Sequence, residues 1–403
     1  MKFHLYIWKR RIEDVLMFPL ILLGRLIGRL GAASPEYETY FFFPFYHIGG
    51  AEKVHAQIAL ATGNERCIIY FTRKSQNDLF HQLFADSKCT LRDVSRYTDN
   101  KWIYFVNIIF RGIISGQINR QKLRPLVFNG QCNFGYKISP WIRRDVPQIE
   151  LIHSLCSFSY IRIPFLPFID ATVMISTIRI REHIDLYRRY GVPALYDPRI
   201  RFIMNAISLP EPVPRPLTEA PLTLLYVGRS TPEKRVHLIA EMAQAATEAG
   251  LSARFEFLGE VKEAIPAALH SYCRFHGNQS DPAVIDRIYA GADVLLLVSD
   301  TEGFPMVVME AMAKGLAIIS TAVGEVPLHV KDAENGFLLQ NFLDGDAVRE
   351  DGLRAIRRLD EDRALLRSMA GRNIGYAFAH FGMERFNREY TQLFQEYRSQ
   401  QRP

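Results

Sequence analysis

At 403 residues the chain is longer than a single hydrophobic core usually supports, so two domains are predicted. Hydrophobic residues make up 48% of the chain and charged residues 23%, which excludes a disordered chain and a polytopic membrane protein. The net charge of +6 is not arranged as a basic stripe interleaved with aromatic residues, so nucleic acid is not an expected partner. Five scattered cysteines without a CxxC pair indicate a reducing, cytoplasmic setting, with neither a disulfide framework nor a zinc site.

Residues 1–35 form a basic extension. Six Lys and Arg residues stand there against Glu13 and Asp14, and the apolar run from Val15 to Gly24 is shorter than the roughly 20 residues needed to span a bilayer. We predict an amphipathic helix through which residues 1–33 bind an anionic membrane surface, so that the protein lies peripherally on the inner face of the membrane. A helix that only packs on the neighbouring domain is the alternative.

From about Tyr37 onward, β-branched and aromatic runs alternate with helical stretches, which predicts an α/β fold with parallel sheets. Residues 36–208 are predicted to form a first Rossmann-like domain, residues 209–221 a proline-rich linker and residues 222–380 a second such domain, with residues 381–403 a helix that crosses back to the first. The pattern of residues 76–124 is too irregular to predict its elements. Strands are predicted at Thr39–Phe45, Cys67–Phe71, Pro125–Asn129, Gln148–Ile152, Thr172–Ile175, Arg201–Met204, Leu222–Val227, Arg254–Leu258, Val294–Val298 and Leu316–Ser320.

The segment Ser299–Gly315 is the most specific signal. It predicts a strand–loop–helix unit in which Pro305 lies in the first helical turn and Gly315 just past the last one. Glu302 then lies in the loop and Glu310 in the helix. Backbone N–H groups at the helix start stabilise an anionic phosphate, and the two carboxylates can accept hydrogen bonds from hydroxyl groups. The structural alternative is a capping acid followed by an exposed helical glutamate.

The segment Leu225–Arg235 repeats the order of strand, glycine turn and helix. It places Arg229 and Lys234 at the carboxyl end of a strand, where two cations can hold a diphosphate and neutralise its growing charge as it leaves. A solvated helix start is the structural alternative. Asp344 and Asp346 spell a D-x-D, but capping of the helix that follows explains them, so no metal and no other cofactor is expected.

In the first half, Phe45–Lys53 follows the first strand and opens a helix. Its tandem glycines, Gly49 and Gly50, permit close approach of the backbone to a ligand, whereas Glu52 is interpreted as an acid of the helix start. His153 ends the predicted strand Gln148–Ile152 and is expected at the same edge of the sheet. A structural histidine at a strand end is the alternative.

Together these motifs resemble those of the GT4 family of retaining glycosyltransferases, whose acids are spaced E-x7-E, as Glu302 and Glu310 are. The resemblance implies the GT-B fold, two Rossmann-like domains facing across a cleft, with the acceptor domain first and the donor-nucleotide domain second. It implies that Glu302 contacts the transferred sugar and Glu310 the ribose. The loop and helix start would supply further donor contacts, mainly through backbone amides: Gly303, Phe304, Met306 and Val307.

The same resemblance assigns Arg229 and Lys234 to the donor diphosphate. Gly49 and Gly50 would meet the donor phosphate and sugar, and His153 the donor sugar. Gly324–Val330 departs from the family pattern, with Glu325 in place of a glycine and His329 near the usual acid, and these departures are expected outside the donor pocket.

The sequence therefore predicts transfer of a hexose-type unit from a nucleoside-diphosphate sugar to a hydroxyl of a glycan or glycolipid acceptor, in the synthesis of surface polysaccharide or glycolipid. Catalysis is assigned to Glu302, His153, Arg229 and Lys234. A glycoside hydrolase also uses two carboxylates but needs no cations for a diphosphate, which disfavours it. A sugar-nucleotide epimerase of the same fold and a non-catalytic scaffold that only binds sugar nucleotide stay open as alternatives.

Overall fold

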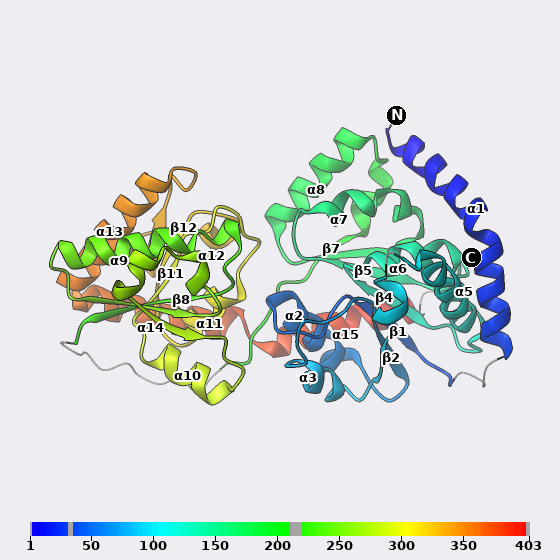
Figure 1. The fold of residues 1–403 in the computed structure, drawn as a ribbon, viewed down its shortest axis with the longest axis horizontal. Coiled ribbons are helices and arrows are strands. Elements are labelled where there is room, and N and C mark those ends of the chain that lie inside the picture. The colour runs from blue at the N-terminus through cyan, green and yellow to red at the C-terminus, as the bar shows by residue number, and fades with distance from the viewer. Residues whose placement is uncertain (1, 31–34, 101, 210, 212–219, 400–403) are drawn as a thin grey trace. The chain divides into compact units, whose positions relative to one another are not determined.

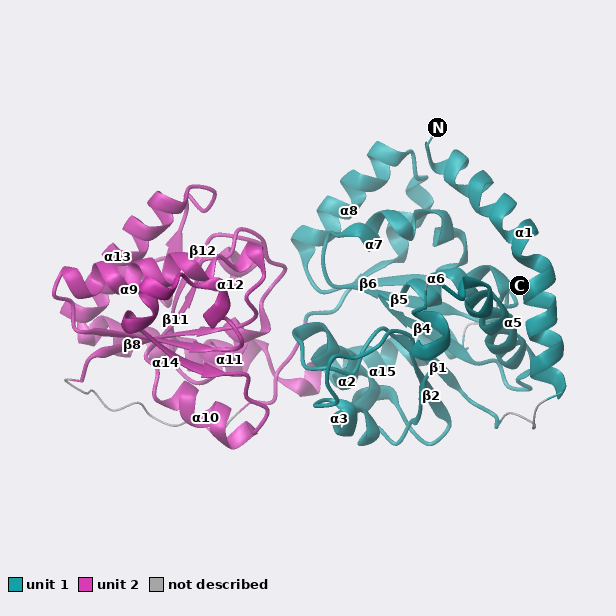
Figure 2. Cartoon of the chain, viewed as in Figure 1, with its two compact units in different colours: residues 1–204, 386–403 teal, residues 205–385 magenta. Residues whose placement is uncertain are grey.

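The computed structural model describes residues 2–30, 35–100, 102–209, 211 and 220–399. The chain forms two compact units, which Figure 2 shows in different colours. Unit 1 comprises Met1–Met204 and Phe386–Pro403, and unit 2 comprises Asn205–Arg385. Most of the predicted proline-rich linker lies outside the described residues.

Unit 1 is built on a seven-stranded parallel sheet with the order β3-β2-β1-β4-β5-β6-β7. Figure 1 labels β1, β2, β4, β5 and β7 of this sheet. Strands β1, β2, β4, β5 and β6 are buried throughout, as expected for a parallel sheet covered by helices on both faces. Its strands are β1 (Thr39–Phe43), β2 (Cys67–Phe71), β3 (Thr90–Asp93), β4 (Leu126–Gly130), β5 (Gln148–Ile152), β6 (Ala171–Met174) and β7 (Ile200–Phe202). Its helices are α1 (Lys2–Leu30), α2 (Gly50–Thr62), α3 (His81–Ala85), α4 (Ser95–Thr98), α5 (Tyr104–Arg120), α6 (Asn133–Ile138), α7 (Ser157–Ile161), α8 (Thr177–Tyr190) and most of α15 (Met383–Ser399).

Unit 2 repeats the design with a six-stranded parallel sheet of order β10-β9-β8-β11-β12-β13. Its strands are β8 (Leu222–Val227), β9 (Ala253–Leu258), β10 (Cys273–Gly277), β11 (Val294–Leu297), β12 (Ala317–Thr321) and β13 (Gly336–Leu339). Its longer helices are α9 (Val236–Glu248), α10 (Pro282–Ala290), α11 (Met306–Ala313), α13 (Gly345–Glu361) and α14 (Arg363–His380). In both sheets the strand order reverses next to the first strand of the unit, and ligands of such sheets bind at the carboxyl ends of the strands at this point.

All ten predicted strands are present, and the prediction of two Rossmann-like sheets is confirmed. Strands β3, β10 and β13 were not predicted. None of these three is buried throughout, so they lack the continuous apolar run that marks a central strand. Helix α11 begins at Met306, so Pro305 is its N-cap and not part of the first turn. Gly315 follows the helix with φ +71°, as predicted for a glycine past the last turn.

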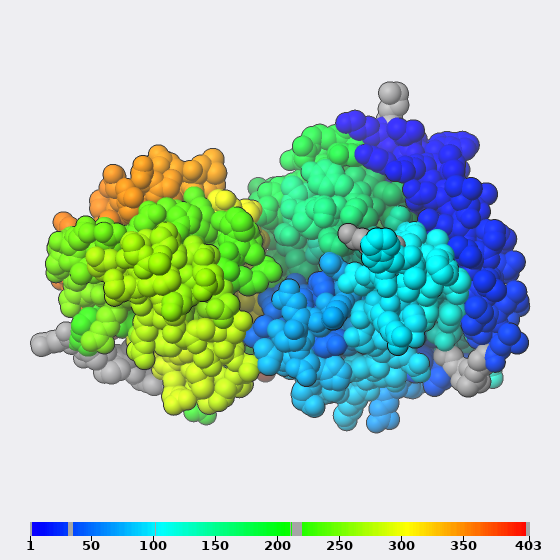
Figure 3. Space-filling model, viewed as in Figure 1, coloured from blue at the N-terminus to red at the C-terminus, as the bar shows by residue number. Residues whose placement is uncertain are grey.

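The N-terminal extension forms the single long helix α1, which continues through Pro19 and lies on the outside of unit 1 (Figure 3). It packs on α5 through glycines. A Cβ atom added to Gly24 would lie 2.1 Å from the carbonyl oxygen of Ile109, and one added to Gly112 would lie 2.2 Å from that of Ile21. The two backbones are therefore in direct contact, and α1 is a packed part of unit 1.

The face of α1 that points away from α5 is mainly apolar and exposed. Both acidic residues of the helix are held in ion pairs, Asp14 with Arg10 and Glu13 with Lys137. The guanidinium of Arg25 donates a hydrogen bond to the carbonyl of Trp141 at 2.8 Å. Arg25 thus faces the body of unit 1, whereas Arg29 is exposed. The exposed large apolar residues of the helix are Leu5, Tyr6, Trp8, Ile12, Val15, Leu16, Phe18, Leu22, Leu23, Leu26, Ile27 and Leu30. The exposed basic residues are Lys2, Lys9, Arg11 and Arg29.

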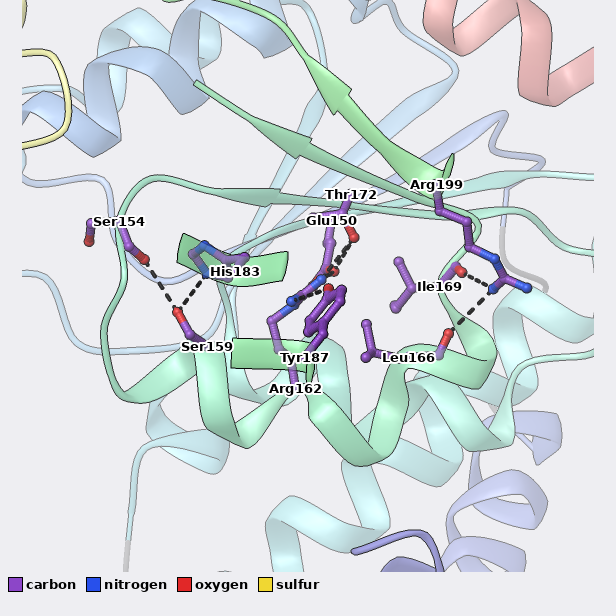
Figure 4. Close-up of polar contacts among 10 residues, drawn as sticks. All are labelled: Glu150, Ser154, Ser159, Arg162, Leu166, Ile169, Thr172, His183, Tyr187 and Arg199. Atoms are coloured by element: carbon purple, nitrogen blue, oxygen red, sulfur yellow. Dashed lines mark hydrogen bonds and ion pairs between the residues drawn. The ribbon is translucent and has the colours of Figure 1, made fainter. Parts of the chain in front are cut away.

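A buried ion pair ties β5 to the helical segment that follows it (Figure 4). Arg162 and Glu150 both have fully buried side chains, and the guanidinium Nε donates to the Glu150 carboxylate at 2.9 and 3.0 Å. Arg162 also donates to the hydroxyls of Tyr187 and Thr172, so the buried charges are satisfied by hydrogen bonds as well as by each other. Glu150 belongs to β5, the strand that ends directly before His153, so this network anchors that strand.

Candidate active site

In unit 2, two of the predicted charged residues meet at the carboxyl end of the sheet. Strands β8 and β11 are neighbours, so the segments that follow them lie side by side. The ammonium of Lys234, which follows β8, donates to Glu302 Oε1, which follows β11. Ser299 Oγ donates to the same oxygen at 2.8 Å, and the backbone N–H of Asp300 donates to the carbonyl of Glu233 at 3.0 Å. The two loops are therefore joined through both side chains and backbone.

Glu310 lies inside α11, as predicted, and its carboxylate is held by a residue that the sequence did not single out. The hydroxyl of Tyr289, from α10, donates to Glu310 Oε2 at 3.0 Å, and the Tyr289 side chain is 1% exposed. Burial and the neighbouring Glu310 carboxylate raise the pKa of Tyr289, so it stays a hydrogen-bond donor. In the sequence, a tyrosine near the end of an amphipathic helix is indistinguishable from an ordinary core residue. The contact between Tyr289 and Glu310 therefore could not be predicted.

Arg229 is exposed at the end of β8. Its backbone carbonyl accepts a hydrogen bond from the hydroxyl of Tyr226 at 2.7 Å, which fixes the turn. Gly259 lies against this turn, because a Cβ atom there would be 2.0 Å from the carbonyl oxygen of Gly228. Arg229 is at the predicted edge of the sheet, but the structure gives its guanidinium no contact with Glu302 or Glu310.

The four other residues predicted to contact the donor, all in the Glu302 loop or at the start of α11, differ in how far they are buried. Gly303 and Val307 are partly exposed, whereas the side chains of Phe304 and Met306 are 4% and 9% exposed. The latter two side chains pack into unit 2, so a ligand in the loop would meet their backbone.

Glu325 and His329, which are expected outside the donor pocket, lie against the Glu302 loop. The backbone N–H of Glu325 donates to the carbonyl of Gly303 at 2.8 Å, and the His329 ring stacks on Phe304 with centroids 4.2 Å apart. Gly324 has φ +55°, and a Cβ atom there would lie 2.1 Å from the Gly303 carbonyl oxygen. The segment after β12 therefore supports the Glu302 loop from behind, a relationship that spacing along the chain does not reveal.

Asp344 caps α13, as predicted for the D-x-D segment. Its carboxylate accepts from the backbone N–H of Asp346 at 3.0 Å and of Ala347 at 3.2 Å. Within the described ranges, no group of three or more His, Cys, Asp or Glu side chains is arranged to hold a metal ion.

In unit 1, the predicted glycines and histidine lie at the carboxyl ends of β1 and β5. Gly49 is the N-cap of α2 and Gly50 is its first residue, while Glu52 lies in the first turn, as predicted. A Cβ atom on Gly49 would be 2.1 Å from Glu52 Oε2. The His153 ring meets a second histidine, His55 of α2, with their Nε2 atoms 3.0 Å apart.

The chain matches known glycosyltransferases in sequence. Residues 221–357 match the family described as glycosyl transferases group 1. A putative colanic acid biosynthesis glycosyltransferase of Escherichia coli, WcaL, is 29% identical over 202 residues, 46% of this chain and 47% of that protein. The N-acetyl-alpha-D-glucosaminyl L-malate synthase of Bacillus anthracis is 26% identical over 186 residues, 44% of this chain and 46% of its own length. The matched segment thus spans about half the length of these relatives.

Solved structures share the fold over most of the chain. HepE of Anabaena, solved in complex with UDP and glucose, superposes with a TM-score of 0.69 at 15% identity and covers 89% of this chain and 100% of its own. The lipopolysaccharide outer core galactosyltransferase WaaB superposes with a TM-score of 0.66 at 19% identity, over 89% and 99% of the two chains. The protein therefore has the GT-B fold. Residues 221–357, which contain the Lys234–Glu302 pair and Glu310, match the family of group 1 glycosyltransferases.

Proposed function

We propose that the protein is a retaining glycosyltransferase that moves a sugar from a nucleoside-diphosphate sugar to a hydroxyl of a glycan or glycolipid acceptor. The observation that carries this proposal is the Lys234–Glu302 pair at the carboxyl edge of unit 2, with Ser299 on the same carboxylate oxygen. A cation and a carboxylate at this edge suit a donor that has a diphosphate at one end of the reacting bond and a polyhydroxylated ring at the other. The resemblance to the GT4 family supports retention of anomeric configuration, and the UDP and glucose bound to HepE support a sugar-nucleotide donor.

In this proposal Lys234 and Arg229 stabilise the negative charge that grows on the leaving diphosphate. Glu302 contacts the transferred sugar, and Glu310, oriented by Tyr289, accepts hydrogen bonds from the ribose hydroxyls. Backbone N–H groups at the start of α11 add dipolar stabilisation of the phosphates. Because these groups meet the charge of the donor, no metal ion is required.

The proposal is tested by adding UDP-, GDP- and ADP-sugars to the purified chain and following thermal unfolding. A donor present at 100 times its Kd stabilises the folded state by about 2.7 kcal/mol. Stabilisation by one nucleotide class, with sugar transfer to an added glycan acceptor, is expected. Turnover of the donor without an acceptor would indicate an epimerase. Stabilisation without any turnover would indicate a binding scaffold. If none of the three classes of nucleotide sugar stabilised the protein, the proposed donor site would be contradicted.

We further propose that the protein binds an anionic membrane surface peripherally through α1, on the cytoplasmic face, where a lipid-linked acceptor would lie. The exposed face of α1 combines large apolar side chains with Lys2, Lys9, Arg11 and Arg29, whereas both acids of the helix are in ion pairs. An apolar face flanked by cations is typical of a helix that lies in the headgroup region. No described helix is long and apolar enough to cross a bilayer.

A further inference from the structure

We propose that His55 is a positioning residue that fixes the proton of His153 on Nδ1, so that His153 presents an N–H donor to its ligand. The identity of that ligand as a donor sugar rests on the proposed function, whereas the position of the proton does not. Neither His55 nor its pairing with His153 was marked by the sequence motifs.

The place of His55 is fixed by packing on three sides. Its side chain is 1% exposed and its ring stacks on Phe43, with centroids 4.6 Å apart and an angle of 12° between the planes. Gly130, at the end of β4, leaves room for it, because a Cβ atom there would lie 2.7 Å from His55 Nε2. The ring therefore cannot turn away from His153, whose Nε2 lies 3.0 Å from its own.

Both imidazoles are neutral at physiological pH. Burial lowers the pKa of His153 to about 4, and burial together with the neighbouring His153 lowers that of His55 well below its ordinary value. A neutral imidazole has one N–H and one acceptor nitrogen, so the 3.0 Å contact holds a single proton. One ring donates and the other accepts.

The surroundings of His55 decide the direction of this hydrogen bond. Its Nδ1 is buried and has no hydrogen-bond partner in the part of the chain that the structure describes. A proton on that nitrogen would leave a buried N–H unsatisfied, which proteins avoid more strictly than an unused acceptor. The proton therefore lies on His55 Nε2 and is donated to His153 Nε2, which leaves the proton of His153 on Nδ1.

The consequence concerns what His153 can do. The backbone N–H of His153 donates to Gln131 Oε1 at 3.3 Å, which holds the strand end, while Nε2 is occupied by His55. Nδ1–H is then the ring group left for a ligand. If the proposed function holds, His153 donates a hydrogen bond to an oxygen of the sugar and does not act as a general base.

The first test needs no activity. Two-bond ¹H–¹⁵N spectra of the full chain, labelled with ¹⁵N-histidine and assigned with His153→Asn, report which ring nitrogen is protonated. We expect His153 protonated on Nδ1 in the wild-type protein and a mixture of tautomers in His55→Leu. A proton on His153 Nε2 in the wild type would overturn the proposal, and so would an unchanged tautomer in a folded His55→Leu variant.

Matched variants of His55 distinguish a role in positioning the His153 proton from a role in packing alone. In His55→Gln the amide nitrogen takes the place of Nε2, whereas in His55→Asn it takes the place of Nδ1 and cannot reach His153. We expect His55→Gln to keep the tautomer and a kcat/KM within about twofold of wild type, and His55→Asn and His55→Leu to lose about fivefold, the equivalent of one hydrogen bond. If the tautomer changes but kcat/KM does not, the inferred ligand contact is wrong. A protein with the expected tautomer and no transferase activity would contradict the proposed function alone.

Discussion

The ammonium of Lys234 and the carboxylate of Glu302 are joined by a hydrogen bond between segments that follow two neighbouring strands, 68 residues apart along the chain. We expect Lys234→Met to lower kcat/KM by roughly 30- to 1,000-fold, or about 2–4 kcal/mol, because the removed cation stabilises charge on the leaving diphosphate. Steady-state kinetics with the donor found in the stabilisation screen measure this loss.

Lys314 offers a matched control in the same unit. Its ammonium pairs with Asp286 at 2.6 Å, and its side chain is 19% exposed, as is that of Lys234. The Lys314 ammonium also lies 5.9 Å from the centroid of the Tyr289 ring, but it has no contact with Glu302. Lys314→Met should therefore lower kcat/KM much less than Lys234→Met does, because its exposed ion pair supports the α10–α11 contact and not the leaving diphosphate. Equal losses in the two variants would mean that Lys234 acts through stability and not through the donor.

Glu310 and Tyr289 form a second pair whose removal should affect donor binding. Glu310→Gln is expected to raise the KM for the donor more than it lowers kcat, because its ribose contact is made equally in the ground state and the transition state. Tyr289→Phe removes the 3.0 Å hydrogen bond that orients the carboxylate and should show the same pattern, about fivefold in KM. A loss confined to kcat in either variant would contradict the assignment of Glu310 to the ribose.

Activity should survive EDTA. Arg229, Lys234 and the start of α11 meet the donor charge in the proposed mechanism, and the Asp344 carboxylate already caps α13. Turnover measured after chelation, and again after Mn²⁺ or Mg²⁺ is restored, checks this expectation. A strict requirement for either ion would show that the metal-free assignment is wrong.

Membrane binding should depend on the outward face of α1. Deleting residues 1–33 would uncover the face of α5 that Gly24 contacts, so substitutions on the exposed face are the sharper test. We expect Trp8→Ser combined with Leu16→Ser and Leu23→Ser to abolish co-sedimentation with vesicles of anionic phospholipid, while binding of the donor nucleotide is unchanged.

The control for this face is Leu343→Ser, which removes an apolar side chain of unit 2 that is 81% exposed, more than any of the three substituted side chains of α1. It should bind vesicles as the wild type does, and raising the salt concentration should weaken wild-type binding, because each cation contributes about 1 kcal/mol at an anionic surface. Wild-type protein that stays in the supernatant at low salt would leave α1 as a purely structural helix.

Acid should destabilise unit 1 through His183. Its buried ring contacts Ser159 Oγ through Nε2 at 2.9 Å (Figure 4). Nδ1 of the same ring lies 2.7 Å from the Arg179 carbonyl oxygen, and burial lowers the pKa of His183 from 6.5 to about 4. Between these two values the unfolded chain binds a proton that the folded chain does not, so the free energy of unfolding falls as the pH falls from about 6.5 to about 4.

Urea unfolding at about pH 7.5 and about pH 5 measures this effect. His183→Gln removes the titrating group, so its loss of stability between the two pH values should be smaller than that of the wild type by about 2 kcal/mol. The comparison uses only the difference between pH values, so a general loss of stability in the variant does not obscure it. Equal acid sensitivity in the two proteins would mean that His183 is not the group that titrates.

Several features of this protein follow from the sequence alone. The strands Gln148–Ile152 and Leu222–Val227 have the predicted bounds, because short, mainly apolar runs are typical of strands that helices cover on both faces. The first of them also buries Gln148 and Glu150, and Glu150 is paired with Arg162. The meeting of Lys234 and Glu302 was also predictable, since parallel strands bring their carboxyl ends to one edge of the sheet. These properties depend on local pattern and on general rules of topology.

The partners that orient the site were decided only by the tertiary structure. Tyr289 on Glu310, Glu325 on Gly303 and His55 on His153 join residues 21 to 98 positions apart. Each contact depends on how a helix is rotated about its axis or how a loop lies on its neighbour, and these are set by packing of the whole core. Which face of α1 is exposed was also decided only by the tertiary structure. The close approach of Gly24 and Gly112 selects the face of α1 that packs on α5, and the amphipathic pattern of α1 alone does not specify this contact.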